Sequence, residues 1–264
     1  MHSIVDVPAG PDPELTGDRL WVLGAVGVEA RDGLLIGSFS DRTAAQAAAA
    51  ALGGRVRTAD DRTGVDAWRT HATWYQVDRF IIRPPWVDAP SVDPANDIVI
   101  DPGPTFGSGS HPSTRLAARL LVDVVQPGMS VTDLGAGSGV LSIIAARLGA
   151  RVTAIDLDPT SPSAVDDNAH RNGVGAHVTA HHRQIESHLV DADVSVLNVT
   201  IDIHERVSSA LQHQPLGRLI VAGILCGEQE ARCAAAHNRT ASRRRVDGEW
   251  AGVVLDDRAT DSSS

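Results

Sequence analysis

The chain has 264 residues, of which 42% are hydrophobic, and this is enough apolar material for one large domain or two modest ones. It contains no stretch of about 18 uncharged apolar residues and no secretory signal pattern in its first ten residues, so we expect neither a membrane span nor export. The net charge of -10 argues against nonspecific nucleic-acid binding, and two cysteines are too few for a disulfide framework, so we expect a cytoplasmic protein.

Residues 1–60 predict a small α+β domain, in which strand, helix, two strands, helix and strand follow one another. Arg31-Asp32-Gly33 between two apolar runs is a hairpin signal. Asp41 is a suitable N-cap for an alanine-rich helix that ends at Gly53-Gly54. The expected strands are Ser3–Val7, Val28–Glu29, Leu34–Phe39 and Arg55–Thr58, and the expected helices are Asp12–Leu23 and Thr43–Leu52.

Residues 61–95 predict a linker that is rich in tryptophan and proline. It holds Trp68, Trp74 and Trp86 among several prolines, and proline-rich segments are stiff and extended. Apolar aromatic side chains in such a segment need a surface to cover. We expect them either to pack the two domains together or to form an aromatic wall that faces a substrate.

Residues 96–257 predict an α/β domain, because strands and helices alternate as they do in a doubly wound parallel sheet. Arg243–Leu255 contains two apolar runs without a helix between them and predicts a closing hairpin. Residues 258–264 are polar and predict a disordered tail. The other expected strands are Ser130–Leu134, Arg151–Asp156, His177–Ala180, Val194–Asn198 and Leu219–Ala222, and the helices are Thr114–Val125, Gly139–Leu148, Ser161–Asn172, Ile201–Leu211 and Gly227–Ala235.

The main chemical signal is a glycine-rich turn where a predicted strand meets a predicted helix. Gly135, Gly137 and Gly139 let the backbone turn sharply and approach a ligand, and the amides that begin the helix point into the same space. The Gly-x-Gly-x-Gly spacing differs from that of pyrophosphate binders. Asp133 would repel a pyrophosphate but suits a ligand with an ammonium and a sulfonium group. The turn therefore predicts an S-adenosylmethionine site rather than a nicotinamide site, with a plain packing turn as the alternative.

Two further polar residues follow predicted strands of the same sheet. Asp156 ends the second strand, where a carboxylate can accept hydrogen bonds from both ribose hydroxyls of a nucleoside, and we prefer it to Asp158 for this role. Asn198 ends the fourth strand, beside the expected crevice. Its amide oxygen can orient a nitrogen nucleophile while its NH₂ group holds the cofactor, so Asn198 is the candidate catalytic residue.

A polar segment rich in glycine precedes the helix that is expected from Thr114. In this segment, residues 101–114, Phe106 can cover a ligand and Thr114 can donate a hydrogen bond to it. We expect His111 to be a hydrogen-bonding group of the segment rather than a catalytic base. The histidines around His177–His182 lack the spacing and the cysteine partner of a metal site, so we expect no metal there.

The segment 101–114 resembles the motif Asp-Pro-Gly-x-x-Phe-Gly-Thr-Gly-x-His-x-Thr-Thr of the PrmA family, whose members methylate a large-subunit ribosomal protein at the stalk base. The resemblance spans about residues 97–255 and includes the glycine-rich turn. Its other matching segments are Ile155–Pro159, Asp167–Gly173, Asn198, Gly223–Leu225 and Gly248–Trp250. It implies a seven-stranded Rossmann-like methyltransferase sheet, and by position it assigns cofactor binding to Thr114, Gly135, Asp156 and Asn198.

The resemblance implies an S-adenosylmethionine-dependent methyltransferase that acts on amino groups of a protein, most simply a ribosomal protein. We expect residues 1–60 to recognise this acceptor, because a second domain beside the cofactor crevice can hold a large substrate. Three features depart from the family pattern: serines at Ser108 and Ser113, a shorter linker, and the sequence of Val199–Asp202. Because Val199–Asp202 should lie near the acceptor, a peptide natural product or a small molecule is an alternative acceptor. A non-catalytic S-adenosylmethionine-binding or interaction module is a second alternative. No contact with nucleic acid or membrane is expected.

Overall fold

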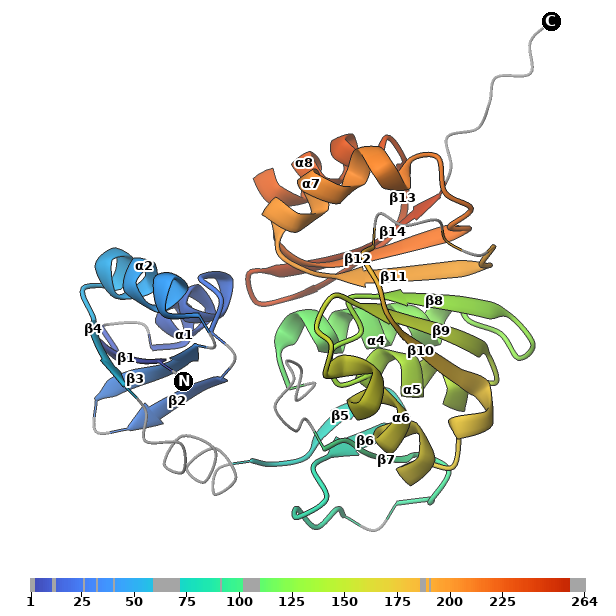
Figure 1. Cartoon of the computed structure of the whole chain (residues 1–264), viewed down its shortest axis with the longest axis horizontal. Coiled ribbons are helices and arrows are strands. Elements are labelled where there is room, and N and C mark those ends of the chain that lie inside the picture. The colour runs from blue at the N-terminus through green and yellow to red at the C-terminus, as the bar shows by residue number, and fades with distance from the viewer. Residues whose placement is uncertain are drawn as a thin grey trace, which may run out of the picture. The chain divides into compact units, whose positions relative to one another are not determined.

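The chain forms two compact units, residues 1–73 and residues 74–264 (Figure 1). The computed structural model describes residues 3–10, 13–25, 27–31, 33–39, 41–58, 72–90, 92–101, 110–185, 189 and 191–256. Phe106, Trp68 and the expected tail at 258–264 lie outside these residues. Within the described ranges, every helix is too short or too polar to cross a bilayer.

The first unit is a four-stranded antiparallel sheet with two helices, in the sequence order expected. The order across the sheet is β2-β3-β1-β4. Asp41 caps the second helix by accepting the amide hydrogens of Thr43 and Ala44, and Gly53 ends that helix at φ +65°. The side chains of Val5, Leu20 and Phe39 are fully buried in its core. The elements are β1 Ser3–Pro8, α1 Pro13–Val22, β2 Gly27–Arg31, β3 Leu34–Phe39, α2 Arg42–Leu52 and β4 Arg55–Thr58.

The second unit begins with a small sheet where the sequence predicts a linker. β5 (Tyr75–Val77), β6 (Phe80–Arg83) and β7 (Asp97–Val99) pair in that order. Phe80 and Ile82 are buried in the same core as helix α4 (Pro112–Val124), so this part of the chain belongs to the domain that follows it. The prediction of a linker is therefore wrong for residues 75–83, because their apolar side chains complete a core instead of connecting two.

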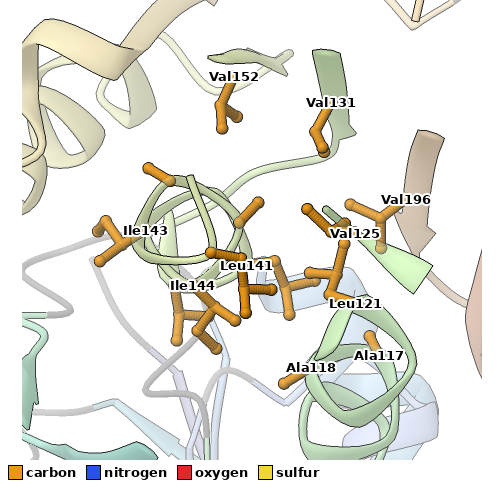
Figure 2. Close-up of a cluster of buried hydrophobic side chains, with 14 of the residues drawn as sticks. Ala117, Ala118, Leu121, Val125, Val131, Leu141, Ile143, Ile144, Val152 and Val196 are labelled. Atoms are coloured by element: carbon orange, nitrogen blue, oxygen red, sulfur yellow. The ribbon is translucent and has the colours of Figure 1, made fainter. Parts of the chain in front are cut away.

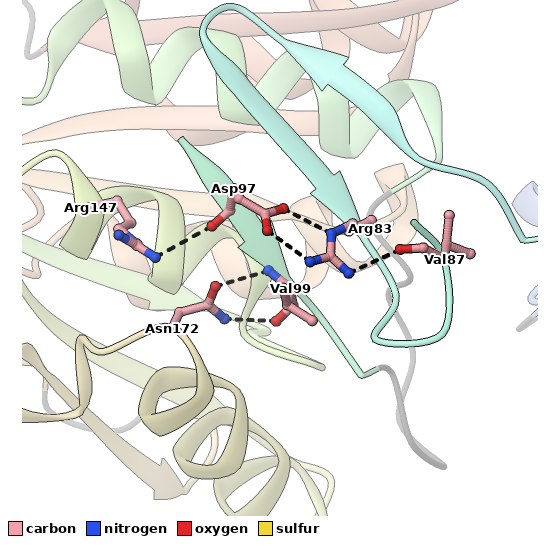
Figure 3. Close-up of polar contacts among 6 residues, drawn as sticks. All are labelled: Arg83, Val87, Asp97, Val99, Arg147 and Asn172. Atoms are coloured by element: carbon pink, nitrogen blue, oxygen red, sulfur yellow. Dashed lines mark hydrogen bonds and ion pairs between the residues drawn. The ribbon is translucent and has the colours of Figure 1, made fainter. Parts of the chain in front are cut away.

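Two polar interactions hold the strand β7 in place (Figure 3). Arg83 on β6 donates two hydrogen bonds, of 3.0 and 2.8 Å, to the carboxylate of Asp97 and a third to the carbonyl oxygen of Val87. On the other side of β7, the side-chain amide of Asn172 accepts the N–H of Val99 and donates to its carbonyl oxygen.

The second unit is built on a seven-stranded sheet of order β10-β9-β8-β11-β12-β14-β13. The pairs from β10 to β12 are parallel, and β14 is antiparallel to both of its neighbours. This confirms the predicted α/β fold, including the closing hairpin β13–β14. The strands are β8 Ser130–Leu134, β9 Arg151–Asp156, β10 Val178–His182, β11 Val194–Asn198, β12 Arg218–Leu225, β13 Thr240–Asp247 and β14 Trp250–Asp256.

Helices cover both faces of this sheet (Figure 1). The core on one face contains apolar residues of α4, α5 and α6, among them Leu121 and Ile144, together with strand residues such as Val131 of β8 (Figure 2). The core on the other face contains residues of α7 and α8, such as Val207 and Cys233. The helical elements are α4 Pro112–Val124, α5 Val140–Arg147, α6 Ser161–Arg171, the short η1 Gly175–His177, α7 Ile201–Leu211 and α8 Glu228–His237.

Candidate active site

The glycine-rich turn lies at the carboxyl end of β8, where the strand order of the sheet changes direction. Gly135, Gly137 and Gly139 have φ values of +81°, +55° and +84°, which residues with a side chain rarely adopt. The amides of Gly135 and Ala136 both donate to the carbonyl oxygen of Ile155, at 2.8 and 3.1 Å. The turn is thus fixed to the end of β9, next to the switch point of the strand order where α/β sheets of this kind bind ligands.

The side chain of Asp156, at the end of β9, also forms a hydrogen bond with the glycine-rich turn. One carboxylate oxygen accepts the N–H of Gly137 at 2.7 Å, and the other accepts the N–H of Asp158 at 2.8 Å. A carboxylate has about four acceptor positions, so about two remain for hydroxyl donors. Asp158 instead accepts the N–H and the hydroxyl of Thr160 just before α6. Asp156 thus contacts the glycine-rich turn, whereas Asp158 contacts the residue before α6, and the choice of Asp156 over Asp158 as the ribose ligand stays a prediction.

Asp133 is buried at the end of β8. Its side chain is 1% exposed and accepts a 2.6 Å hydrogen bond from the hydroxyl of Ser142 on α5. The pKa of Asp133 is raised to about 6, mainly by burial and also by the negative charge of Asp156, while hydrogen bonds from Ser142 lower it. Asp133 thus contacts α5, and its contact with a ligand ammonium group stays a prediction.

Two of the three glycines are also needed for packing. A Cβ atom on Gly139 would lie 3.0 to 3.2 Å from atoms of Val165 on α6, and one on Gly135 would lie 3.3 Å from Val199. The absence of a side chain at Gly139 lets α5 and α6 approach each other. The packing role of Gly139 comes in addition to its cofactor role, which stays a prediction.

Asn198 and Thr114 are brought together although 84 residues separate them. The amide Nδ2 of Asn198, at the end of β11, donates to the hydroxyl oxygen of Thr114 in the first turn of α4 at 3.1 Å. This hydrogen bond fixes the orientation of the amide, so that Oδ1 is the atom left to accept a hydrogen bond. The hydroxyl of Thr114 in turn keeps its own hydrogen to donate.

Asp101 and Ser110, which flank residues 102–109, are bound by side chains that the sequence analysis did not assign. Asn168 of α6 accepts the N–H of Asp101 and donates to its carbonyl oxygen, at 2.9 and 2.8 Å. The same amide donates to the carbonyl oxygen of Ser138 in the glycine-rich turn at 3.0 Å. At the other end, Arg115 donates to the carbonyl oxygen of Ser110. Asn168 lies in the matching segment Asp167–Gly173, which was the available signal.

His111 is the N-cap of α4, consistent with the expected hydrogen-bonding role. Its Nδ1 accepts the N–H of Ser113 at 3.2 Å and lies 2.7 Å from the hydroxyl of Ser113. The ring packs edge-on against Trp250, with ring centroids 4.5 Å apart. Burial, assisted by the charge of Arg115, lowers the pKa of His111 to about 4, so the ring is neutral at pH 7.

Comparison with known proteins gives consistent matches. The family model described as "Ribosomal protein L11 methyltransferase (PrmA)" matches residues 42–258. A ribosomal protein L11 methyltransferase from Symbiobacterium thermophilum is 35% identical over 235 residues, which are 87% of this chain and 76% of the relative. One from Alteromonas mediterranea is 36% identical over 181 residues, 67% of this chain and 61% of the relative.

A solved structure agrees with these sequence matches. The ribosomal protein L11 methylase from Lactobacillus delbrueckii subsp. bulgaricus superposes with a TM-score of 0.63 at 26% identity, and the match covers 70% of this chain and 98% of that one. The family match extends over most of the chain and includes every site residue discussed above. This chain therefore belongs to the ribosomal protein L11 methyltransferase (PrmA) family of S-adenosylmethionine-dependent protein methyltransferases.

Proposed function

We propose that this protein methylates amino groups of ribosomal protein L11 in its own organism. The family match over residues 42–258 and the names of its relatives support this acceptor. One observation supports the chemistry within the chain: the hydrogen bond from Asn198 to Thr114, which places an oriented amide at the sheet edge that also carries the glycine-rich turn.

The site fits S-adenosylmethionine as the methyl donor. Gly137 has a positive φ angle and no side chain, so a ligand can approach the backbone of the turn beside the start of α5. Asp156 has acceptor positions left for two ribose hydroxyls, and Thr114 has a hydroxyl hydrogen to donate. Phe106 is proposed to cover the ligand. When bound, the cofactor supplies a methyl group that is already activated by its positively charged sulfur.

Asn198 is proposed to position the acceptor nitrogen. Because Thr114 occupies one N–H of its amide, Oδ1 can accept a hydrogen bond from the amine and align its lone pair. The amine must be neutral, and we propose that its proton passes to water. Asp133 is buried against Ser142, and His111 is engaged with Ser113, so neither is assigned as the base.

Mass spectrometry of proteins from a strain that lacks this gene tests the proposal. We expect L11 to lose the mass of one or more methyl groups, and we expect the wild-type gene to restore it. Asn198→Ala should not restore it, whereas Asp158→Ala should. Methyl loss from another protein or peptide would contradict L11 as the acceptor and favour the alternative motivated by Val199–Asp202. Cofactor binding without turnover on any acceptor would identify a non-catalytic module.

A further inference from the structure

Three side chains of metal-binding type converge between α7 and α8, away from the glycine-rich turn. His204 comes from α7, and Cys233 and His237 come from successive turns of α8. One ligand atom of each lies within 4.8 Å of the other two. His204 and Cys233 are fully buried, and His237 is 2% exposed. The four-residue spacing puts Cys233 and His237 on one face of their helix, facing His204.

The hydrogen bonds of His204 leave one nitrogen directed at this cluster. Its Nε2 donates to the carbonyl oxygen of Ala222 at 2.9 Å, because a carbonyl can only accept. Its Nδ1 therefore carries a lone pair, and it lies 3.3 Å from Nε2 of His237. A backbone carbonyl that binds the far nitrogen of a histidine is the usual support of a metal ligand, since it fixes both the tautomer and the ring orientation.

We propose that His204, Cys233 and His237 bind a divalent transition-metal ion of the zinc class, with water as the fourth ligand. Two nitrogen ligands of a tetrahedral zinc ion lie roughly 3.4 Å apart, given zinc–nitrogen bonds of about 2.0 to 2.1 Å. The observed separation of 3.3 Å agrees with this value. The nitrogen–sulfur separation in such a site is roughly 3.6 Å. The three side chains would therefore have to move together by about 1 Å to bind an ion.

The protons of the three ligands are accounted for on binding. On binding, the sulfur–hydrogen bond is replaced by a sulfur–metal bond and one proton leaves to solvent. The hydrogen on Nε2 of His237 moves to Nδ1 of the same ring, with no net change.

The ion would join α7 and α8 to the strand that lies beside the candidate active site. Ala222, the partner of His204, is paired with Asn198 in the register of β11 and β12. The next residue, Gly223, approaches Val199 so closely that a Cβ atom would lie 2.2 Å from its carbonyl oxygen. An ion at His204 thus stabilises the packing that supports Asn198. The test of this site does not depend on the acceptor proposed above.

Metal titration of the full chain, stripped with a chelator, tests the site. We expect one equivalent of zinc per chain, an increase in the unfolding temperature, and with cobalt the charge-transfer absorption of a cobalt–thiolate bond. Cys233→Ala should remove the absorption band and weaken zinc binding by at least 10-fold. Cys226→Ala is the matched control, because Cys226 is half-buried and outside the cluster, and it should leave both readouts unchanged.

Surface histidines are the alternative binding site for the metal ion. A double substitution, His181→Ala with His182→Ala, should leave zinc binding unchanged. Wild-type protein that binds no zinc or shows no cobalt–thiolate band would overturn the site, and this measurement needs no folded variant. Binding that survives Cys233→Ala at full affinity, or that is lost in the surface variant, would also overturn it.

Discussion

Asp156 contacts two backbone amides, one in the glycine-rich turn and one in its own strand-end turn, and this double role sets the expected effect of replacing it. Asp156→Ala should weaken S-adenosylmethionine binding by about 1–3 kcal/mol, the usual cost of losing charge-assisted hydrogen bonds. Calorimetric titration measures this change. Asp158→Ala removes a neighbouring carboxylate and should bind nearly as wild type. Equal affinity of the Asp156 variant and the wild type would exclude the ribose role.

The buried carboxyl of Asp133 makes stability depend on pH. Its pKa is about 6 in the folded chain, against 3.8 for an exposed aspartate, so the unfolded chain loses this proton first. The contribution of Asp133 to stability is therefore full below about pH 4, falls as the pH rises to about 6, and is constant above that. This trend is opposite to that of an aspartate in an ion pair.

Asp133→Asn should remove this trend. The amide keeps the shape of the side chain and can still accept the hydrogen bond from Ser142, but it never ionises. Relative to wild type, the variant should gain on the order of 2 kcal/mol in unfolding free energy between pH 4.5 and pH 7.5. Denaturant titrations at the two pH values measure it. A constant difference between the two proteins would show that the pKa of Asp133 is the same in the folded and the unfolded chain.

The sequence was informative about residues whose roles are set by the backbone around them. Thr114 and Asn198 follow from positions at the start of a helix and the end of a strand, and the structure brings them into contact. The direction of the Asp133 side chain depends on which face of β8 the helix α5 covers, and this is a tertiary property. The role of Gly139 likewise depends on Val165, which lies on another helix.

The helix α6 uses two asparagines, four residues apart, as hydrogen-bonding partners for the backbone of residues 99 and 101. Asn172 binds both polar groups of Val99, and Asn168 binds both polar groups of Asp101. Asn168 also reaches Ser138, so one side chain connects the segment before Phe106 to the glycine-rich turn. A helix thereby positions two loops of the site at once.

Asn168→Asp should weaken both the fold and the site. A carboxylate cannot donate, so the carbonyl oxygens of Asp101 and Ser138 would lose their partner at a buried position. We expect a loss of about 1–3 kcal/mol in unfolding free energy together with weaker cofactor binding. Asp167→Asn, at the adjacent exposed position, is the control. An unchanged denaturation midpoint for Asn168→Asp would contradict the connecting role.

Helices and strands could be predicted where their hydrophobic periodicity agrees with the capping and turn residues at their ends. The first unit has capping residues and hairpin signals, and its elements follow the predicted order. The strands β5 and β6 were missed because they have only three and four residues and lie among tryptophans and prolines. Nothing local shows that Phe80 and Ile82 pack with α4, since their partners are more than 30 residues further along the chain.

At the scale of the whole molecule, the described candidate site residues all lie in residues 74–264, whereas residues 1–73 form a unit with its own core. We propose that this first unit recognises the protein acceptor, because a separate folded unit is a suitable holder for a large substrate. The structure also changes the boundary at which this is tested. A fragment that begins near Ser91 would lack Phe80 and Ile82 and expose a core.

A fragment of residues 74–264 should fold, bind S-adenosylmethionine with near-normal affinity and fail to methylate full-length L11. Calorimetry and a methyl-transfer assay measure the two properties, and thermal unfolding verifies the fold. A fragment that starts at Ser91 should unfold at a lower temperature. Methylation of L11 by the longer fragment at the wild-type rate would refute the recognition role. Loss of cofactor binding by the folded fragment would show that residues 1–73 contribute to the cofactor site.

The asparagine contacts of α6 also bear on aggregation between copies of the protein. β6 pairs with one side of β7. On the other side, Arg147 binds the carbonyl oxygen of Asp97, and Asn172 and Asn168 bind both polar backbone groups of Val99 and Asp101. An open strand edge is a template on which another chain can add a strand and begin to aggregate. Side chains take the place of such a strand at Val99 and Asp101, so they oppose intermolecular β-pairing there.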